Sequence, residues 1–202
     1  EFITALAFSP DGKTLASAAG FTEADIRLWE VATGKQIGRL DGHGSWVGAL
    51  VFWPDGKKLA SSSADQTIRT WDIASQKGLD VLRGHRLEVW RLALLPDAKT
   101  LVSGGKDGTV CFWDTSYSHD RQSRRTLPTT KVVNANFAPD GRSILTLNRQ
   151  GQVAQWAGAD FQLGTPLLEL GNNVFTACFS DDGRFLAASW TNGTLQVWDL
   201  SQ

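Results

Sequence analysis

The chain has 202 residues, 42% of them hydrophobic, so it has enough apolar side chains to form a large core. Its 20 lysines and arginines nearly balance 21 aspartates and glutamates, which leaves a formal net charge of −1. This balance gives no support to a nucleic-acid or anionic membrane partner, and no apolar run is long enough to span a membrane.

The apolar residues come in short alternating runs, which predict β-strands rather than helices. The first run covers residues 4–8, and comparable runs return at 47–52, 132–137 and 174–179. A second run follows at 59–61 or 101–103, a third at 67–71, and a fourth at 35–40 or 166–170. Each copy of this pattern therefore reads as successive strands joined by turns.

A tight turn follows the first strand of each copy. The five turns are Ser9-Pro10-Asp11-Gly12, Trp53-Pro54-Asp55-Gly56, Leu95-Pro96-Asp97-Ala98, Ala138-Pro139-Asp140-Gly141 and Ser180-Asp181-Asp182-Gly183. Proline presets φ, aspartate bonds its own backbone, and glycine takes the left-handed conformation that closes an antiparallel hairpin. Ala98 is the one poor fit to this pattern.

Five tryptophans close the copies at spacings of 42, 42, 43 and 42 residues. They are Trp29, Trp71, Trp113, Trp156 and Trp198. A period near forty indicates a β-propeller array, in which each copy is one four-stranded blade that cannot bury its faces alone. The predicted blades are 1–41, 42–83, 84–127, 128–170 and 171–202, the last without its fourth strand. Nineteen strands are therefore expected.

Two further features concern the chain's context. Cys111 and Cys178 fall in strand runs of different copies, so we expect two buried apolar residues rather than a disulfide or metal site. The sequence has no methionine and begins inside a strand run, which suggests a segment of a longer protein. The two isolated cysteines lean towards a reducing compartment, so the cytoplasm is favoured without being established, and no motif predicts a cofactor.

These residues resemble the WD40 repeat family along the whole chain. The closing dipeptide occurs at Trp71-Asp72, Trp113-Asp114 and Trp198-Asp199, and the opening dipeptide at Gly42-His43 and Gly84-His85. The resemblance implies an all-β propeller, of which this chain would be five consecutive blades of a larger, seven-bladed ring. A compact five-bladed ring and end-to-end stacking of two chains remain alternatives. An uncovered blade face or edge would then associate with missing blades or another chain.

The resemblance also implies a buried hydrogen-bonded relay of histidine, serine, aspartate and tryptophan within a blade. The complete sets are His43, Ser61, Asp65 and Trp71 in copy two, and His85, Ser103, Asp107 and Trp113 in copy three. The other copies are degenerate, with Ser17 and Glu23, Thr146 and Gln150, or Ala188 and Asn192. Serine, histidine and aspartate also make nucleophilic triads, but duplication at the repeat period favours a structural role, so no catalytic residue is expected.

Proteins of this family are mostly non-catalytic platforms that bind proteins or peptides on one face and at the channel mouth. The candidate contacts on that face are Trp90, Phe175, Trp46, Lys106 and Arg149. The aromatic residues could instead pack between blades, and the two basic residues would add charge selection. A second hypothesis is that the chain is a recruitment or regulatory module of an enzyme whose catalytic domain lies elsewhere. The amino-acid sequence of the repeats resembles that of repeat arrays in prokaryotic kinases and regulators.

Overall fold

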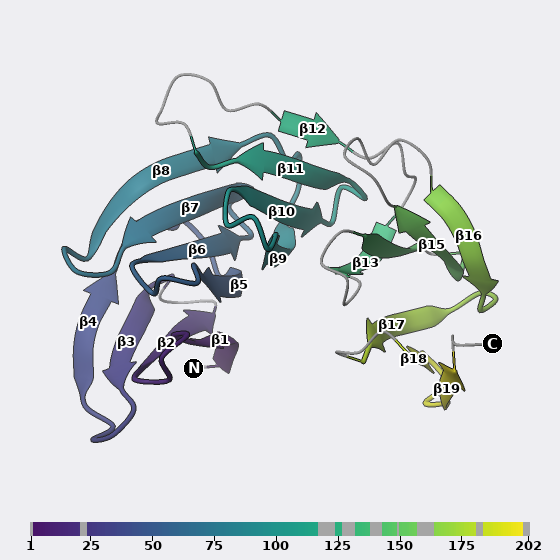
Figure 1. Cartoon of the computed structure of the whole chain (residues 1–202), viewed down its shortest axis with the longest axis horizontal. Helices are drawn as coiled ribbons and strands as arrows, with labels where there is room; N and C mark the ends of the chain where they lie inside the picture. The colour runs from purple at the N-terminus through teal and green to yellow at the C-terminus, as the bar shows by residue number, and fades with distance from the viewer. Residues whose placement is uncertain are drawn as a thin grey trace. The chain divides into compact units, whose positions relative to one another are not determined.

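The computed structural model describes residues 2–20, 24–116, 124–126, 132–137, 143–148, 150–156, 164–180 and 184–199. All regular secondary structure in these residues is β, and they contain no helix. Nineteen strands form five antiparallel sheets, four with four strands and one with three (Figure 1). The prediction of an all-β fold of five repeated sheets, the fifth without a fourth strand, is therefore confirmed.

Strands that follow each other in the chain are neighbours in each sheet. Sheet 1 contains β1 (Phe2–Phe8), β2 (Thr14–Gly20), β3 (Ile26–Glu30) and β4 (Gln36–Leu40). Sheet 2 contains β5 (Val47–Phe52), β6 (Lys58–Ser63), β7 (Thr67–Asp72) and β8 (Lys77–Arg83). Sheet 3 contains β9 (Val89–Leu94), β10 (Thr100–Gly105), β11 (Val110–Asp114) and β12 (Arg124–Thr126). Sheet 4 contains β13 (Val132–Phe137), β14 (Ile144–Asn148), β15 (Gln152–Trp156) and β16 (Gly164–Glu169). Sheet 5 contains β17 (Val174–Phe179), β18 (Phe185–Trp190) and β19 (Leu195–Asp199).

The chain forms two compact units. The first comprises Glu1–Asp107 with Cys111–Arg125, and the second comprises Gly108–Val110 with Thr126–Gln202. Sheets 1, 2 and most of sheet 3 belong to the first unit, and sheets 4 and 5 belong to the second. Each unit thus holds consecutive copies of the repeat.

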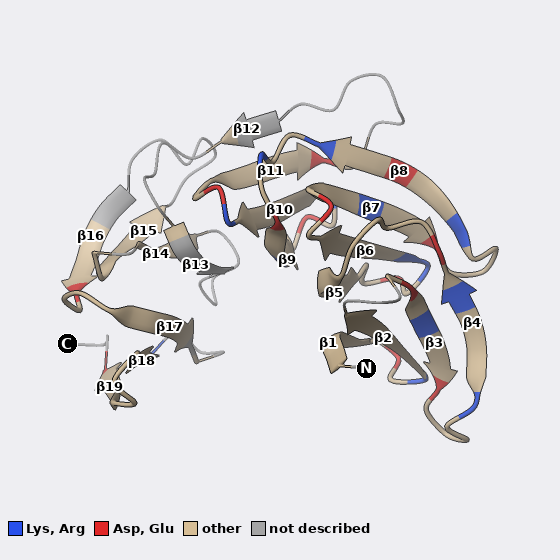
Figure 2. Ribbon diagram, turned by 180° about the vertical axis from the view of Figure 1, so that it is seen from behind, with Lys and Arg blue, Asp and Glu red and all other residues tan. Residues whose placement is uncertain are grey.

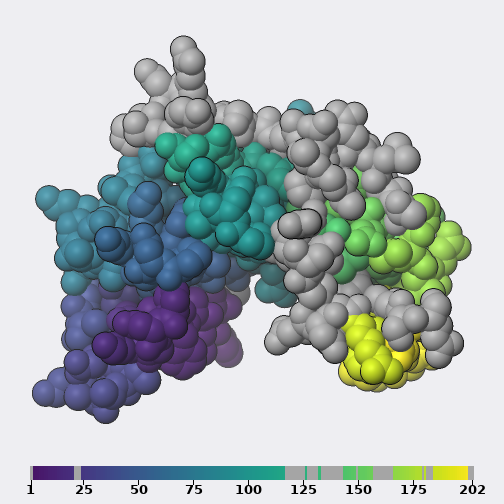
Figure 3. All heavy atoms as spheres, viewed as in Figure 1, coloured from purple at the N-terminus to yellow at the C-terminus, as the bar shows by residue number. Residues whose placement is uncertain are grey.

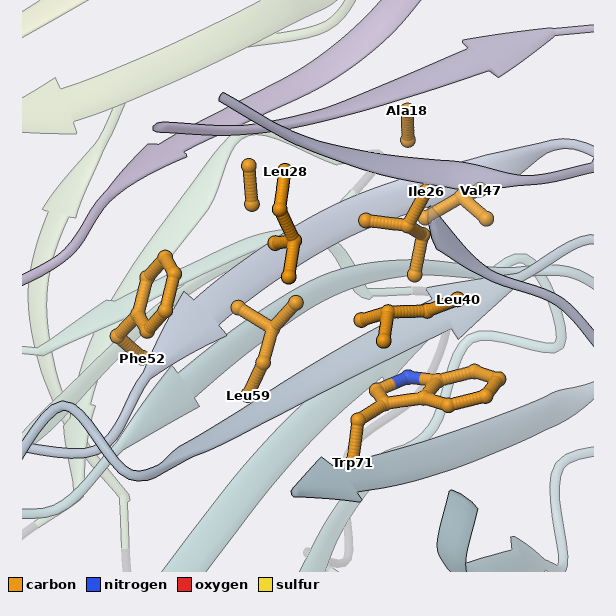
Figure 4. Close-up of a cluster of buried hydrophobic side chains, with 9 residues drawn as sticks. Ala18, Ile26, Leu28, Leu40, Val47, Phe52, Leu59 and Trp71 are labelled. Carbon is orange, nitrogen blue, oxygen red and sulfur yellow. The ribbon is translucent and has the colours of Figure 1, made fainter. Parts of the chain in front are cut away.

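In the first unit, apolar side chains of neighbouring sheets meet face to face. Ile26 and Leu28 of sheet 1 pack with Val47 and Leu59 of sheet 2, and the ring of Trp71 belongs to the same cluster (Figure 4). Burying one such aliphatic side chain contributes about 1.5–3 kcal/mol, so this contact stabilises both sheets. A second cluster joins sheets 2 and 3; its buried members are Trp53, Ala60, Ile68, Leu82, Val89, Leu101, Cys111 and Trp113.

The second unit repeats this packing. Leu147 and Val153 of sheet 4 form one buried cluster with Val174, Leu186 and Ala188 of sheet 5. Cys178 on β17 is exposed, so the prediction that both cysteines are buried is right for Cys111 and wrong for Cys178. Residue 178 alternates to the solvent face of its strand, because successive side chains of a strand point to opposite faces.

Some apolar side chains stay open to solvent. Phe8 ends β1 as Phe52 ends β5, yet Phe8 is 61% exposed whereas Phe52, in the cluster between sheets 1 and 2, is 8% exposed. Figure 3 shows sheet 1, in purple, at the surface of the first unit. In the second unit, Leu195 and Val197 of β19 are also exposed. That a further blade of the same repeat covers such faces remains a prediction.

The outer strand of sheet 1 receives a side chain from sheet 2. The backbone N–H of Arg39 in β4 donates to Oε1 of Gln76 at 3.3 Å, and Nε2 of Gln76 donates to the carbonyl of Ile37 at 3.1 Å. β4 lies at the edge of its sheet, so these groups have no strand partner on that side. Gly38 makes room, because a Cβ at this position would lie 2.7 Å from the Gln76 amide.

Ala98 adopts the strained conformation that the turn requires. Its φ is 53°, close to the 70° of Gly12 and the 68° of Gly56 in the equivalent turns. Its carbonyl accepts the indole N–H of Trp53 at 3.0 Å, so the turn is also tied to sheet 2. Alanine in the left-handed region costs about 1–2 kcal/mol, a cost that glycine avoids.

Ala98→Gly is therefore expected to raise the free energy of unfolding by about 0.5–1 kcal/mol, after a small loss of methyl packing. The measurement is a urea titration followed by circular dichroism. Gly56→Ala provides the reciprocal control, since it should lower stability by a similar amount at the same turn position. Equal stability of Ala98→Gly and the unmodified protein would show that the turn is not strained.

Candidate functional site

The four predicted relay residues of copy two lie together in the structure. His43 precedes β5, Ser61 lies in β6, Asp65 lies in the turn after β6, and Trp71 lies in β7. Nδ1 of His43 is 2.8 Å from Oδ2 of Asp65, and Nε2 of His43 is 2.7 Å from Oγ of Ser61. The indole N–H of Trp71 donates to the same Oγ at 2.8 Å. The contacts therefore run unbroken from the turn to the tryptophan in the core.

Copy three shows the same contacts. Nδ1 of His85 is 3.0 and 3.1 Å from the carboxylate oxygens of Asp107, and Nε2 is 2.7 Å from Oγ of Ser103. Trp113 donates its indole N–H to Ser103 at 2.8 Å. Asp107 also accepts the backbone N–H of Arg86 at 2.8 Å, so it fixes the loop that precedes β9.

The surroundings of the two relays shift their pKa values. Burial of Asp65 opposes ionisation, but hydrogen bonds from His43, Thr67 and the backbone N–H of Gly44 outweigh it and hold the pKa of Asp65 well below its usual range. Burial of His85 opposes protonation, but Cys111 and Asp107 outweigh it and raise the pKa of His85. Both shifts favour charged forms within the relays.

These residues do not form an open nucleophilic site. The hydroxyls of Ser61 and Ser103 lie in the interior, and each accepts an indole N–H. A nucleophile has to reach a substrate carbonyl, which a fully buried hydroxyl cannot do. The arrangement instead satisfies polar groups that would otherwise be buried without partners.

Two copies that looked degenerate in sequence keep part of the relay. Trp29 donates its indole N–H to Ser17 at 2.7 Å, and Trp156 donates to Thr146 at 2.8 Å. Ala188 offers no such hydroxyl in sheet 5. A hydroxyl residue ten or twelve positions before the tryptophan is the sequence signal for this contact. Glu23 lies outside the described residues.

Sheet 1 contains a charged cluster that the sequence did not reveal. Asp25 is buried, and its Oδ2 lies 2.9 Å from Nε of Arg27 and 3.3 Å from Nε of Arg39. Arg39 also contacts Asp41 at 2.7 Å. The two arginines compensate the buried carboxylate, which isolated burial would strongly disfavour.

The first strand of every sheet, in chain order, has a β-bulge at one equivalent position. The register shifts between Ile3 and Ala5, Val47 and Ala49, Val132 and Asn134, and Val174 and Thr176, and opposite Gly104 and Gly105 in sheet 3. The bulged residues are Thr4, Gly48, Trp90, Val133 and Phe175. A bulge re-aims its side chain away from the regular alternation. Two of the predicted contacts, Trp90 and Phe175, occupy this position.

In the first unit, Trp90 lies in a polar cluster. Its indole N–H donates to Oε2 of Glu88 at 3.0 Å, and Nζ of Lys106 lies 2.9 Å from Oε1 of the same carboxylate. The hydrogen bonds from Lys106 and Trp90 lower the pKa of Glu88. Figure 2 shows basic and acidic residues adjacent at the turn between β10 and β11, where Lys106 lies.

Trp46 lies next to Trp90. A Cβ on Gly48 would be 3.2 Å from a ring carbon of Trp46 and 3.2 Å from the carbonyl oxygen of Trp90. The missing side chain of Gly48 therefore lets the Trp46 ring approach the backbone of β9. Trp46 and Trp90 are half-buried and Lys106 is exposed, so the structure brings these three predicted residues into one area of the first unit.

The remaining predicted contacts lie elsewhere. Phe175 is 71% exposed, but it belongs to the second unit. Arg149 lies outside the described residues. Trp53 is buried in the core, and Trp190 packs against Trp198 with ring centroids 5.8 Å apart.

The described part of the chain contains no group of three or more histidine, cysteine, aspartate or glutamate side chains placed to hold a metal ion. The same residues contain no helix that could cross a membrane. A cavity of about 250 Å³ lies on sheet 4, and its lining includes Thr146, Gln152 and Trp156.

The chain is similar to several curated proteins over short segments. "Nuclear distribution protein nudF" of Emericella nidulans is 52% identical over 51 residues, which are 25% of this chain and 11% of that protein. "Nuclear distribution protein PAC1" of Coprinopsis cinerea is 41% identical over 59 residues, 27% of this chain and 14% of that protein. "Periodic tryptophan protein 2 homolog" of Neurospora crassa is 40% identical over 62 residues, 31% of this chain and 7% of that protein. These matches span only a small part of each relative. All three organisms are fungi, so the matches do not support the predicted resemblance of these repeats to prokaryotic repeat arrays.

The repeat family described as "WD domain, G-beta repeat" matches residues 1–30, 34–72, 76–114 and 164–199. Most of the fourth copy falls outside these matches; it has Pro128 at the opening position and Ala157 after its tryptophan. The matches nevertheless cover more than half of the chain and agree with the repeated sheets and their closing tryptophans. The chain therefore belongs to the WD40 repeat family.

Proposed function

We propose that this chain is a non-catalytic scaffold that binds a protein or peptide through the area around Trp90, Trp46 and Lys106 in the first unit. Membership of the WD40 family and the repeated sheets support a protein-interaction role. The observation that carries the proposal is Trp90, a half-buried aromatic residue on a β-bulge whose indole is held by Glu88. Rigid, partly exposed aromatic side chains contribute most of the binding energy in many protein interfaces.

Two further points belong to this proposal. Phe175 provides a separate contact in the second unit, since it is highly exposed at the equivalent bulge. The balanced charge favours protein partners over nucleic acid or membrane surfaces. The proposal names a class of partner, a protein or peptide, and not an individual protein. That these blades belong to a larger propeller is also a proposal, and it rests on the family.

Trp90→Ala is expected to weaken binding of peptides selected from a random phage-displayed library by about 30-fold, the loss of one interface hot spot. The melting temperature should change little, because the Trp90 ring is not part of the buried clusters. Affinity is measured by fluorescence anisotropy and stability by thermal unfolding. Trp190→Ala is the matched control, since that ring packs against Trp198 in the second unit. Unchanged affinity of Trp90→Ala would exclude this face, and a large fall in melting temperature would assign Trp90 to packing.

A further inference from the structure

Glu88 joins two hydrogen-bond donors from different parts of sheet 3. The Trp90 indole N–H comes from β9, and the Lys106 ammonium comes from the turn after β10, eighteen residues away from Glu88. Their distances to the carboxylate are 3.0 and 2.9 Å. Convergence of an N–H group and an ammonium on one carboxylate is the geometry of an anion-binding site. This site is occupied by the protein's own side chain.

The carboxylate of Glu88 can be exchanged for one from solution. Its side chain is 30% exposed and that of Lys106 is 45% exposed, so both donors can be reached from solvent. The Glu88 side chain can leave by rotating about its own bonds, without a change in β9. Replacing one carboxylate by another keeps both hydrogen bonds, so the exchange itself is nearly neutral in free energy.

The charges around this site favour an acidic partner. Arg86 is exposed, and its guanidinium makes no hydrogen bond or ion pair within the described residues. Asp107, which follows Lys106 in the same turn, is bonded to His85 and the backbone of Arg86. Arg86, Glu88 and Lys106 together leave one positive charge, which attracts an anionic group.

Apolar surface adjoins these charges. Leu87, between Arg86 and Glu88 in the sequence, is 46% exposed, and Trp90 and Trp46 are half-buried. We propose that the partner is a peptide segment that presents a carboxylate beside an apolar side chain, and that Glu88 holds the place of this carboxylate in the free protein. This inference rests on the proposed function, because it specifies what the same face recognises.

The test uses two synthetic ten-residue peptides with a neutral dye, identical except that one carries four aspartates and the other four lysines around two leucines. Binding to the full chain is measured by fluorescence anisotropy at low and moderate salt. The aspartate peptide should bind about tenfold more tightly than the lysine peptide. Glu88→Gln should tighten binding of the aspartate peptide about threefold, because it removes the competing carboxylate. Lys106→Glu should abolish the preference.

Lys57→Glu is the charge-matched control. Lys57 is exposed in the turn between β5 and β6, away from the turn between β10 and β11 that holds Lys106, so this substitution should leave the preference unchanged. Weaker binding of the aspartate peptide to Glu88→Gln would overturn the inference, because Glu88 would then only position Trp90. Equal binding of both peptides, lost in Trp90→Ala, would also overturn it but leave the proposed function standing. A charge preference unaffected by Trp90→Ala would show that the peptides bind away from Trp90, and would contradict the proposed binding face. Absence of binding by either peptide would overturn the inference, whereas the phage-selected peptides test the proposed function separately.

Discussion

Replacing Trp71 by alanine is expected to lower the free energy of unfolding by about 3–5 kcal/mol, which makes it the most destabilising single change proposed. The ring is almost fully buried in the cluster between sheets 1 and 2, so its removal leaves a cavity (Figure 4). The change also removes the indole N–H that Ser61 accepts, and the edge contact with the His43 ring, whose centroid lies 6.0 Å away. A urea titration followed by far-ultraviolet circular dichroism measures the loss.

Two variants separate the contributions to this effect. Trp71→Phe keeps most of the ring but loses the hydrogen bond to Ser61, so it should cost about 1–3 kcal/mol. Trp198→Ala is the matched control in sheet 5, where Ala188 replaces the hydroxyl residue and the tryptophan is only partly buried. We expect a loss of about 1–2 kcal/mol there. If Trp198→Ala proved as destabilising as Trp71→Ala, the buried relay would have no special energetic role.

Asp65→Asn is expected to lower the free energy of unfolding by about 2–3 kcal/mol at pH 7. Both carboxylate oxygens of Asp65 accept hydrogen bonds, and the amide nitrogen cannot accept those made to the oxygen that it replaces. The difference should depend on pH. The folded-state pKa of Asp65 lies below its unfolded value near 3.9, so the ionised carboxylate stabilises the fold above about pH 4. That contribution is lost as the pH falls from about 4 towards the folded-state pKa. Urea titrations between pH 7 and pH 3 should therefore show the two proteins converging in stability.

Asp72→Asn controls for general effects of acid and of losing a carboxylate. Asp72 accepts hydrogen bonds from Ser75 in an exposed turn, and its pKa is also lowered by them. Its replacement should cost much less than that of Asp65 at pH 7, since exposed groups exchange these bonds with water. A constant difference between Asp65→Asn and the unmodified protein at every pH would mean that the charge of Asp65 does not stabilise the relay.

Local sequence signals were sufficient to predict the strands, the turns between them and the five repeated sheets. Hairpin turns depend on the residues inside them, so Pro54, Asp55 and Gly56 already specify where one strand ends and the next begins. Side chains of a strand alternate between its two faces, so Ile68 and Trp71, three residues apart in β7, pack against different neighbouring sheets. For the same reason, the positive φ of Ala98 follows from its place in the turn and not from its own preference.

Contacts between surface side chains could not be predicted in this way. The link from Glu88 to Lys106 depends on two rotamers eighteen residues apart, and no period or motif encodes it. The approach of Trp46 to Trp90 depends on the close packing of β5 against β9 at Gly48. Asp25 was missed because its compensating arginines lie on two different strands, β3 and β4. Sequence therefore indicated which positions to examine, while the structure showed how their charges are arranged.

The side-chain amide of Gln76 protects the edge strand β4 from pairing with a strand of another molecule. By bonding Ile37 and Arg39, it occupies two backbone groups on β4 that an incoming strand from another molecule would otherwise use. Deamidation of Gln76 would replace the donor at Ile37 by a carboxylate oxygen, leaving two acceptors facing each other. Chemical ageing at one surface residue would thus open the rim of the sheet to intermolecular strand exchange.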